Sequence, residues 1–398
     1  MLADYVSLLK AAPRPIAFGF LLATLSSFGQ TFFIALSAAG LRDAFGISDG
    51  WLGSAYAVAT LASGFTLGWA GRWIDRLQLR QFTALSALLL VVGCGAMALV
   101  PSAWLLVPVL FLLRLSGQGL LSHTAMTATA RHFRHERGKA LALVALGFAA
   151  GEALLPPLSI VVMAASGWGG LWWMSAAVVL VGTWAAMRLL PREAARPAMA
   201  AAGHGALPGP RLLRDPRLWI VLPAMLAPSF VVTGFFFHQL RLVSEVDWNL
   251  GVIAVGFAGF AIVRAAAMVA IGPRVDHVGA ARLLPVYLLP LAGAMVAIML
   301  GSGQPFAALG YLALMGLTSG MSTTLMTALW TEFYGVERLG SVRAAMSGAG
   351  VVASALAPAM FGVLLDLGIS LRSQAGGCLA YVLVASLLTL LLARYRSQ

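Results

Sequence analysis

Three ionisable side chains, those of Arg114, Glu152 and Arg264, lie inside long runs of apolar residues. Each stands more than about ten residues into its run, which is roughly 16 Å along a helix that rises 1.5 Å per residue. A charge at such a depth in a bilayer costs about 2.5–3.5 kcal/mol on insertion scales, so it faces a cavity or another charge. Because a guanidinium binds carboxylates through two parallel hydrogen bonds, these residues predict a site for an anion and a proton.

The positions of the three charged residues suggest a different role for each. Arg114 and Glu152 fall on consecutive predicted helices at matched depth, so we expect them to pair, either to orient the helices or as part of a site. Arg264 has no acid in its own apolar run, so we predict that it contacts substrate. Glu152 is the predicted proton-coupling residue, because a substrate that competes for Arg114 favours protonation of its carboxylate.

Uncharged polar residues lie at similar depth. We predict that Gln30, Tyr56 and Gln118 line the same site together with Arg114 and Arg264. Gln118 follows Arg114 by four residues, so both side chains lie on one face of a helix. For each of these residues, a hydrogen bond between helices is an equally good interpretation.

The composition explains which elements must hold these residues. The chain has 398 residues, of which 60% are hydrophobic and 10% charged, and its mean hydropathy is +0.90. Apolar runs of about 20 residues recur throughout, which is the length of a bilayer-spanning helix. We predict an all-α polytopic membrane protein with twelve transmembrane helices, at about 15–39, 51–72, 80–100, 103–126, 139–163, 168–190, 217–240, 250–272, 282–301, 305–328, 341–365 and 374–394.

The distribution of basic residues predicts the orientation. The net charge is +12, and most of the 26 lysines and arginines lie in segments on the same side as the two termini. Basic loops stay in the cytoplasm, so we predict that both termini are cytoplasmic and that the protein lies in a bacterial inner membrane. Contact with anionic lipid accounts for the charge, and no nucleic-acid partner is expected.

The chain also repeats itself. A long polar segment rich in Pro, Gly, Ala and Arg predicts three parts: an N-terminal six-helix bundle at 1–190, a cytoplasmic linker at 191–216 and a C-terminal six-helix bundle at 217–398. A constant shift of 201 residues places Gly71 on Gly272 and Asp75 on Asp276. Repeats of this kind occur in secondary transporters.

The short loop between the second and third predicted spans carries a recognisable motif. The residues Gly71-x-x-x-Asp75-Arg76 resemble the cytoplasmic signature loop of the major facilitator superfamily. The resemblance implies two six-helix bundles related by pseudo-two-fold symmetry, transport by alternating access, and a monomer. It also implies gating roles for Gly71, Arg72, Asp75, Arg76 and the second copy of the acid, Asp276.

A narrower resemblance points to the substrate. The stretch "RHFRHERGKALALVALGFAAGE", which ends at Glu152, is similar to the loop and fifth span of monocarboxylate and oxalate/formate carriers. Arg264 is similar to the arginine with which those carriers bind a carboxylate. Their acid one turn earlier is replaced here by Phe260.

These observations predict a secondary active transporter of a small organic anion, a carboxylate, coupled to protons as a symporter or exchanging as an antiporter. The alternative is a proton-coupled antiporter that exports drugs or cations, with Glu152 as the cation site. The chain lacks His-Glu-x-x-His, Gly-x-Ser-x-Gly and phosphate-loop motifs, so we expect no enzyme activity, no cofactor and no metal.

Overall fold

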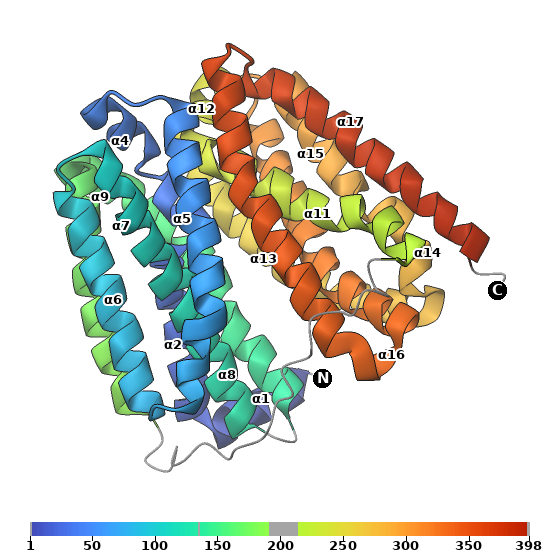
Figure 1. The fold of residues 1–398 in the computed structure, drawn as a ribbon, viewed down its shortest axis with the longest axis horizontal. Coiled ribbons are helices and arrows are strands. Elements are labelled where there is room, and N and C mark those ends of the chain that lie inside the picture. Colours follow the sequence, from blue (N-terminus) through green and yellow to red (C-terminus); the bar gives the residue numbers. More distant parts are fainter. Residues whose placement is uncertain (1, 134–135, 191–213, 396–398) are drawn as a thin grey trace. The chain divides into compact units, whose positions relative to one another are not determined.

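The protein is built from helices. A computed structural model describes residues 2–133, 136–190 and 214–395, and every regular element in those ranges is a helix (Figure 1). The chain divides into two compact units, one comprising residues 1–47 and 55–200 and the other residues 48–54 and 201–398. Most of the predicted linker, residues 191–213, lies outside the described residues, so its boundaries stay a prediction.

The first unit contains the helices of the N-terminal half, with α5 belonging to it from residue 55 onward. Their bounds are α1 Leu2–Ala11, α2 Pro13–Leu25, η1 Ser26–Gly29, α3 Thr31–Ala35, α4 Ala38–Phe45, α5 Asp49–Ala70, η2 Gly71–Asp75, α6 Leu79–Leu99, η3 Ala103–Leu105, α7 Leu106–Leu113, η4 Arg114–Leu121, α8 Ser122–His132 and α9 Arg137–Leu189. Helix α9 packs against both α2 and α6.

The second unit contains α11 Pro216–Phe237, α12 Gln239–Glu245, α13 Leu250–Val278, α14 Ala280–Tyr287, α15 Leu289–Leu300, α16 Pro305–Asp366, α17 Leu371–Thr389 and η5 Leu390–Tyr395. Helix α16 packs along α13, α11 and α15. The start of α5 groups with this unit because the Asp366 carboxylate accepts hydrogen bonds from the Ser48 hydroxyl (2.6 Å) and the Gly50 amide (3.0 Å).

The spanning segments agree with the predicted twelve. Ten helical stretches in the described residues are long and apolar enough to cross a membrane. One of them is α9, which has 53 residues and breaks at Gly167, where φ is +67°, so it supplies two spans. The twelfth is α5, a helix of 22 residues whose glycines, serines and threonines lower its hydropathy. The prediction of an all-α polytopic fold is confirmed.

A proline inside α11 frees a backbone carbonyl that a tyrosine then binds, and a second tyrosine bonds to a neighbouring carbonyl. Pro228 has no N–H, so the carbonyl of Ala224, one turn earlier, loses its helical donor. The Tyr287 hydroxyl donates to that carbonyl instead. The Tyr381 hydroxyl donates to the Pro223 carbonyl at 2.7 Å. Unsatisfied backbone groups are costly in a bilayer, so these tyrosines stabilise the helix.

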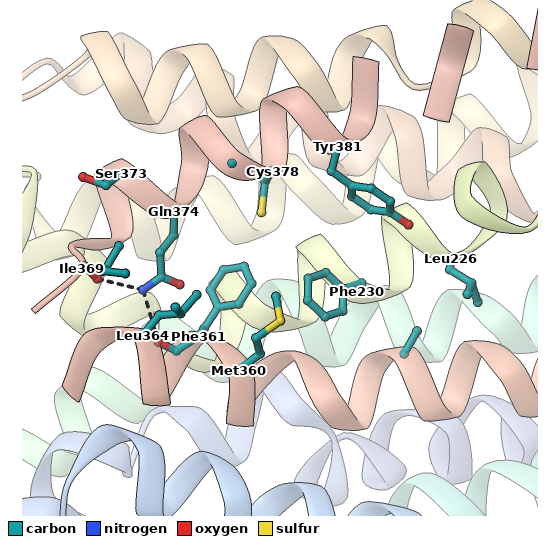
Figure 2. Close-up of a pocket in the computed structure, with 12 residues that line it drawn as sticks. Leu226, Phe230, Met360, Phe361, Leu364, Ile369, Ser373, Gln374, Cys378 and Tyr381 are labelled. Carbon is teal, nitrogen blue, oxygen red and sulfur yellow. Dashed lines mark hydrogen bonds between the residues drawn. The ribbon is translucent and has the colours of Figure 1, made fainter. Parts of the chain in front are cut away.

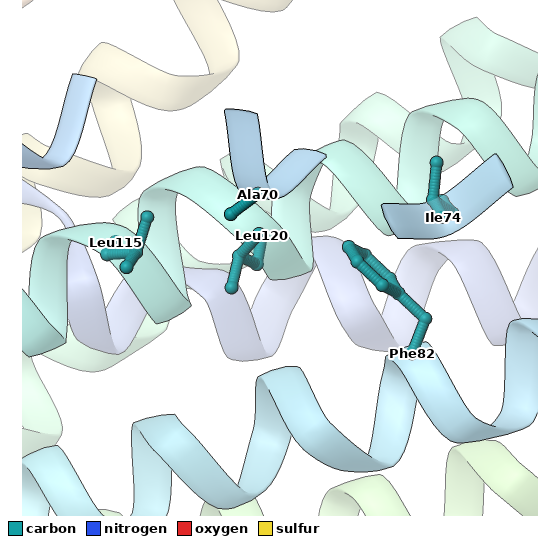
Figure 3. Close-up of a cluster of buried hydrophobic side chains, with 5 residues drawn as sticks. All are labelled: Ala70, Ile74, Phe82, Leu115 and Leu120. Carbon is teal, nitrogen blue, oxygen red and sulfur yellow. The ribbon is translucent and has the colours of Figure 1, made fainter. Parts of the chain in front are cut away.

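A small apolar cluster fixes the motif loop in the first unit. It holds the end of α5 and η2 against α6 and η4, because side chains from these four segments bury one another (Figure 3). Its buried members are Ala70, Ile74, Phe82, Leu115 and Leu120. The backbone that carries Asp75 is therefore anchored on both sides.

Asp215 is the N-cap of α11 in the second unit. Its carboxylate accepts from the Arg217 amide at 2.9 Å and from the Arg217 guanidinium, with Nη2 at 3.0 Å. Burial by itself raises the pKa of Asp215, but the hydrogen bonds from Arg217 outweigh it and the pKa is lowered. The carboxylate therefore contributes stability above the unfolded pKa of about 3.9, and this contribution is lost as the pH falls through the lower folded pKa.

We expect Asp215→Ala to lower the free energy of unfolding by about 1 kcal/mol at pH 7, the usual value of an N-cap side chain. The difference from wild type should shrink below about pH 4, where the carboxylate is protonated in the unfolded chain. Thermal unfolding of the purified protein across pH values measures both effects. Asp215→Asn keeps the capping oxygen, so its free energy of unfolding should fall less than that of Asp215→Ala. A pH-independent difference would contradict the assignment.

Candidate functional site

The first span is interrupted where the polar residues begin. The sequence predicts one helix over about 15–39, but α2 ends at Leu25 and the short 3₁₀ segment η1 follows. The Ser26 hydroxyl donates to the Ala23 carbonyl at 2.7 Å, and Gln30 adopts an extended conformation with φ −88° and ψ 157°. Serine side chains that bond to nearby backbone compete with helical bonds. The break leaves the Gly29 carbonyl available to a side chain.

Glycine contacts hold this break from one side. A Cβ atom at Gly29 would lie 2.2 Å from the Leu113 carbonyl, and one at Gly117 would lie 2.6 Å from the Gly29 Cα. The backbones of η1 and η4 therefore touch, and neither position accepts a larger residue.

The opposite side of the break is held by α9. A Cβ atom at Gly147 would lie 2.3 Å from the Phe20 carbonyl, and one at Gly151 would lie 2.0 Å from the Ser27 hydroxyl. The two glycines are four residues apart, a spacing of small residues that allows such close helix approach. The glycines at 29 and 117 carry no spacing signal and were missed.

Arg114 begins η4, a π-helical segment within the fourth span. π-helical turns inside α-helices frequently occur at functional sites. Arg114 is only 5% exposed, and its Nη1 donates to the Gly29 carbonyl (3.3 Å), the Thr31 hydroxyl (3.4 Å) and the Gln118 side-chain oxygen. The Nε atom is buried and has no hydrogen-bond partner among the described residues.

Tyr56 completes the surroundings of the guanidinium. Its ring lies under Arg114, with 5.2 Å between Cζ and the ring centroid, and its hydroxyl is 2.6 Å from the Thr31 hydroxyl. Tyr56 is fully buried. The first unit thus brings together Arg114, Gln118, Thr31 and Tyr56, and the contacts that these residues make with Arg114 are all to neutral groups.

Glu152 lies on α9, next to the break at η1. It is 6% exposed, and it directly follows Gly151, whose contact with Ser27 fixes it next to η1. Gln30 follows η1 as the N-cap of α3 and is half-buried. The predicted ion pair between Arg114 and Glu152 stays a prediction.

Arg264 belongs to the second unit. It is half-buried on α13, and its Cζ lies 5.9 Å from the centroid of the Phe260 ring. Close contacts with α16 position this part of α13, because a Cβ atom at Gly320 would lie 2.3 Å from the Arg264 carbonyl. The backbone under Arg264 is therefore rigidly placed.

The motif loop forms an ion pair that the sequence did not identify. The Asp75 carboxylate binds Arg131 on α8, and Arg131 also donates to the Ile74 carbonyl at 3.3 Å. Arg72 and Arg76 are exposed, whereas Gly71 is buried beside His123. The pair lies within one unit and joins the second span to the fourth.

The second copy of the loop differs. Asp276 is exposed on α13, and the residue at the position of Arg131 shifted by 201 is Glu332. The Glu332 carboxylate accepts from the Ala280 amide at 2.7 Å and the Ala281 amide at 3.3 Å, so it caps α14. The exchange of Arg131 for Glu332 in the repeat was the signal that could have revealed the ion pair.

If Asp75 acts in gating, Asp75→Asn should lower uptake at least about fivefold, which corresponds to roughly 1 kcal/mol in a two-state equilibrium. The melting temperature should hardly change, because a half-exposed ion pair contributes only about 0–1 kcal/mol to stability. Uptake into proteoliposomes and thermal unfolding measure the two quantities. The exchanged pair Asp75→Arg with Arg131→Asp should recover part of the uptake. Full activity of Asp75→Asn would contradict the role.

No group of three His, Cys, Asp or Glu side chains within residues 2–133, 136–190 and 214–395 is arranged to hold a metal ion. The free thiols of Cys94 and Cys378 are both buried.

Comparison with known proteins identifies the fold. The sequence matches the family described as Major Facilitator Superfamily over residues 17–358. The crystal structure of the nucleoside transporter NupG is similar, with a TM-score of 0.76 at 12% sequence identity, and the match covers 97% of this chain and 99% of that one. A structure of a point mutant of NupG has a TM-score of 0.71 at 11% identity, covering 95% and 98%. A search of curated proteins found no match.

Proposed function

Because this chain belongs to the Major Facilitator Superfamily, whose fold supports secondary transport by alternating access, we propose that it carries a small organic anion, in particular a carboxylate. It is a multi-pass membrane protein and a transporter rather than an enzyme. We place it in a bacterial inner membrane with both termini in the cytoplasm, working as a monomer.

The observation that carries the proposal is the environment of Arg114. Its guanidinium is buried, its hydrogen-bond acceptors are neutral, and its Nε–H has no acceptor among the described residues. A buried cation attracts an anion strongly because water does not screen it. A carboxylate could accept from the guanidinium while the hydroxyls of Thr31 and Tyr56 donate to it.

Two further residues support the same substrate class. Arg264 would supply a second cationic contact for the substrate. With Glu152 ionised, the charges of Arg114, Glu152 and Arg264 sum to +1, which suits a monoanion. Protonation of Glu152 would couple a proton to the anion, and exchange of one anion for another is the other mode.

Export of cations or drugs is the second candidate, and the buried carboxylate of Glu152 favours it. In that case Arg114 and Arg264 would be structural. The similar structure of a nucleoside transporter adds neutral polar molecules to the compounds worth testing.

The test is thermal stabilisation of the purified protein by carboxylates, nucleosides and lipophilic cations. A ligand at 100 times its Kd stabilises by about 2.7 kcal/mol, so one class of carboxylate should raise the melting temperature by several degrees. Arg114→Gln and Arg264→Gln should each remove this effect. Arg241→Gln, an exposed arginine on α12, is the matched control and should keep it.

Stabilisation by cations alone, unchanged in both arginine variants, would overturn the proposal in favour of export. Stabilisation by nucleosides alone would overturn the anion class while leaving Arg114 as a candidate contact.

A further inference from the structure

A cavity of about 570 Å³ lies in the second unit, between α11, α16 and α17, and some of its lining residues, such as Met360 and Gly377, are exposed (Figure 2). Its volume falls within the range of about 300–1,000 Å³ that is typical of small-molecule sites. The rings of Phe230, Phe361 and Tyr381 line it, and none of its described lining residues is charged. None of the residues of the proposed anion site takes part in it.

Gln374 is the buried polar side chain among the lining residues, whereas Ser373 is exposed. Gln374 is 6% exposed, and its Nε2 donates to the Phe361 carbonyl at 3.2 Å and to the Ile369 carbonyl at 2.9 Å. Two carbonyl acceptors on one side of an amide require the NH₂ group there, so the orientation of Gln374 is fixed. Its oxygen must lie on the other side.

The Gln374 oxygen has no hydrogen-bond donor. Oε1 is buried and has no partner among the described residues. In Figure 2 the oxygen of the amide is turned toward the Phe361 ring, while the nitrogen makes the two dashed bonds. A buried acceptor without a donor is unfavourable, so a donor from a ligand would relieve it.

The aromatic walls specify the rest of the ligand. Phe230 packs edge-on against Phe361 at 5.8 Å between ring centroids and against Tyr381 at 6.5 Å. The Tyr381 hydroxyl already donates to the Pro223 carbonyl, so Tyr381 presents its ring. Such walls favour another aromatic ring in edge-to-face contact. The absence of charge among the described lining residues disfavours an ion.

We propose that this cavity binds a neutral aromatic molecule with a single hydrogen-bond donor, of the class of alkylated phenols, whose hydroxyl donates to Gln374 Oε1. The site is separate from the proposed anion site, and its test does not depend on the transported substrate.

The chain offers a variant that alters the cavity wall. Gly377 lines it, and a Cβ atom there would meet nothing within 4 Å, so Gly377→Leu adds a bulky side chain at the cavity wall without a clash. Gly376 points elsewhere, with Met299 Cε 3.6 Å from its Cβ position, which is an ordinary contact. Gly376→Ala is therefore the matched control.

The experiment compares the melting temperatures of wild type, Gly377→Leu and Gly376→Ala with 2,6-diisopropylphenol and with its methyl ether. The phenol should stabilise wild type and Gly376→Ala by several degrees relative to Gly377→Leu. The ether has no hydrogen-bond donor. It should therefore need a roughly tenfold higher concentration for the same stabilisation, because it lacks one hydrogen bond. Gln374→Met should make the two compounds equal.

Three results would each overturn the proposal. In the first, the phenol fails to stabilise wild type. In the second, the phenol and the ether stabilise wild type equally. In the third, the phenol stabilises Gly377→Leu as much as wild type. The comparison of the two compounds on wild type keeps the test decisive even if the Gln374 variant fails to fold.

Discussion

Uptake by the Glu152→Gln variant will be independent of pH, whereas wild-type uptake of the same carboxylate will rise as the pH falls. Glutamine matches the shape of a protonated glutamate, so the variant holds the site permanently in its neutral form. Glu152 lies at 6% exposure beside the η1 break, where a charge is sensitive to what occupies its surroundings. Over two pH units the wild-type rate should change by about tenfold or more, because one proton is taken up per cycle.

The matched control lies at the start of the same helix. Glu136 is the N-cap of α9, is exposed, and pairs with Lys139 at 3.1 Å. Glu136→Gln should keep the wild-type pH profile. If Glu152→Gln also kept it, proton coupling at Glu152 would be wrong and anion exchange would become the better mechanism. Counterflow of labelled carboxylate in proteoliposomes distinguishes the two, because exchange persists without a proton gradient.

The second large effect is steric. Gly29→Ala should lower the free energy of unfolding by about 3 kcal/mol, the upper part of the range for overpacked cores, because its Cβ would lie 2.2 Å from the Leu113 carbonyl. The three nearest atoms, from Leu113, Gly117 and Gln118, are all backbone atoms, which leaves little room for relaxation. Gly29→Val should prevent accumulation of folded protein. Size-exclusion chromatography and thermal unfolding in detergent measure both outcomes.

Gly68 on α5 provides the control for this prediction. A Cβ atom there would meet nothing within 4 Å. Gly68→Ala should be neutral or stabilise by up to about 1 kcal/mol, because alanine favours helices more than glycine does. Equal stability of Gly29→Ala and Gly68→Ala would show that η1 and η4 can separate, and the arrangement around Arg114 would then be adjustable.

Much of the fold followed from the sequence because a bilayer imposes a length and a polarity on every span. Apolar runs and turn residues predicted twelve helices, and the structure confirms them. Short-range spacing also predicted a contact correctly, since Gln118 lies four residues after Arg114 and accepts a hydrogen bond from it. Gly147 and Gly151 were recognisable because small residues at a spacing of four allow helices to touch.

What the sequence did not predict depends on contacts between distant residues. The Asp75–Arg131 pair joins positions 56 residues apart. The Gly29–Gly117 contact joins η1 to η4, and neither glycine belongs to a recognisable pattern. Hydropathy indicates that a helix is present, but it does not indicate where its backbone breaks. The break at η1 depends on serine hydroxyls and on the neighbours that hold it. The roles assigned to the site residues stay predictions.

The π-helical segment that begins at Arg114 has a consequence for evolution. Segments of this kind arise when one extra residue is accommodated inside an α-helix, because each bond spans five residues instead of four. A relative whose fourth span is α-helical throughout therefore crosses the same depth with one residue fewer. An alignment of the two sequences requires a single-residue gap in the middle of a membrane span. Without that gap, every residue after Arg114 in this span would be compared with the wrong neighbour.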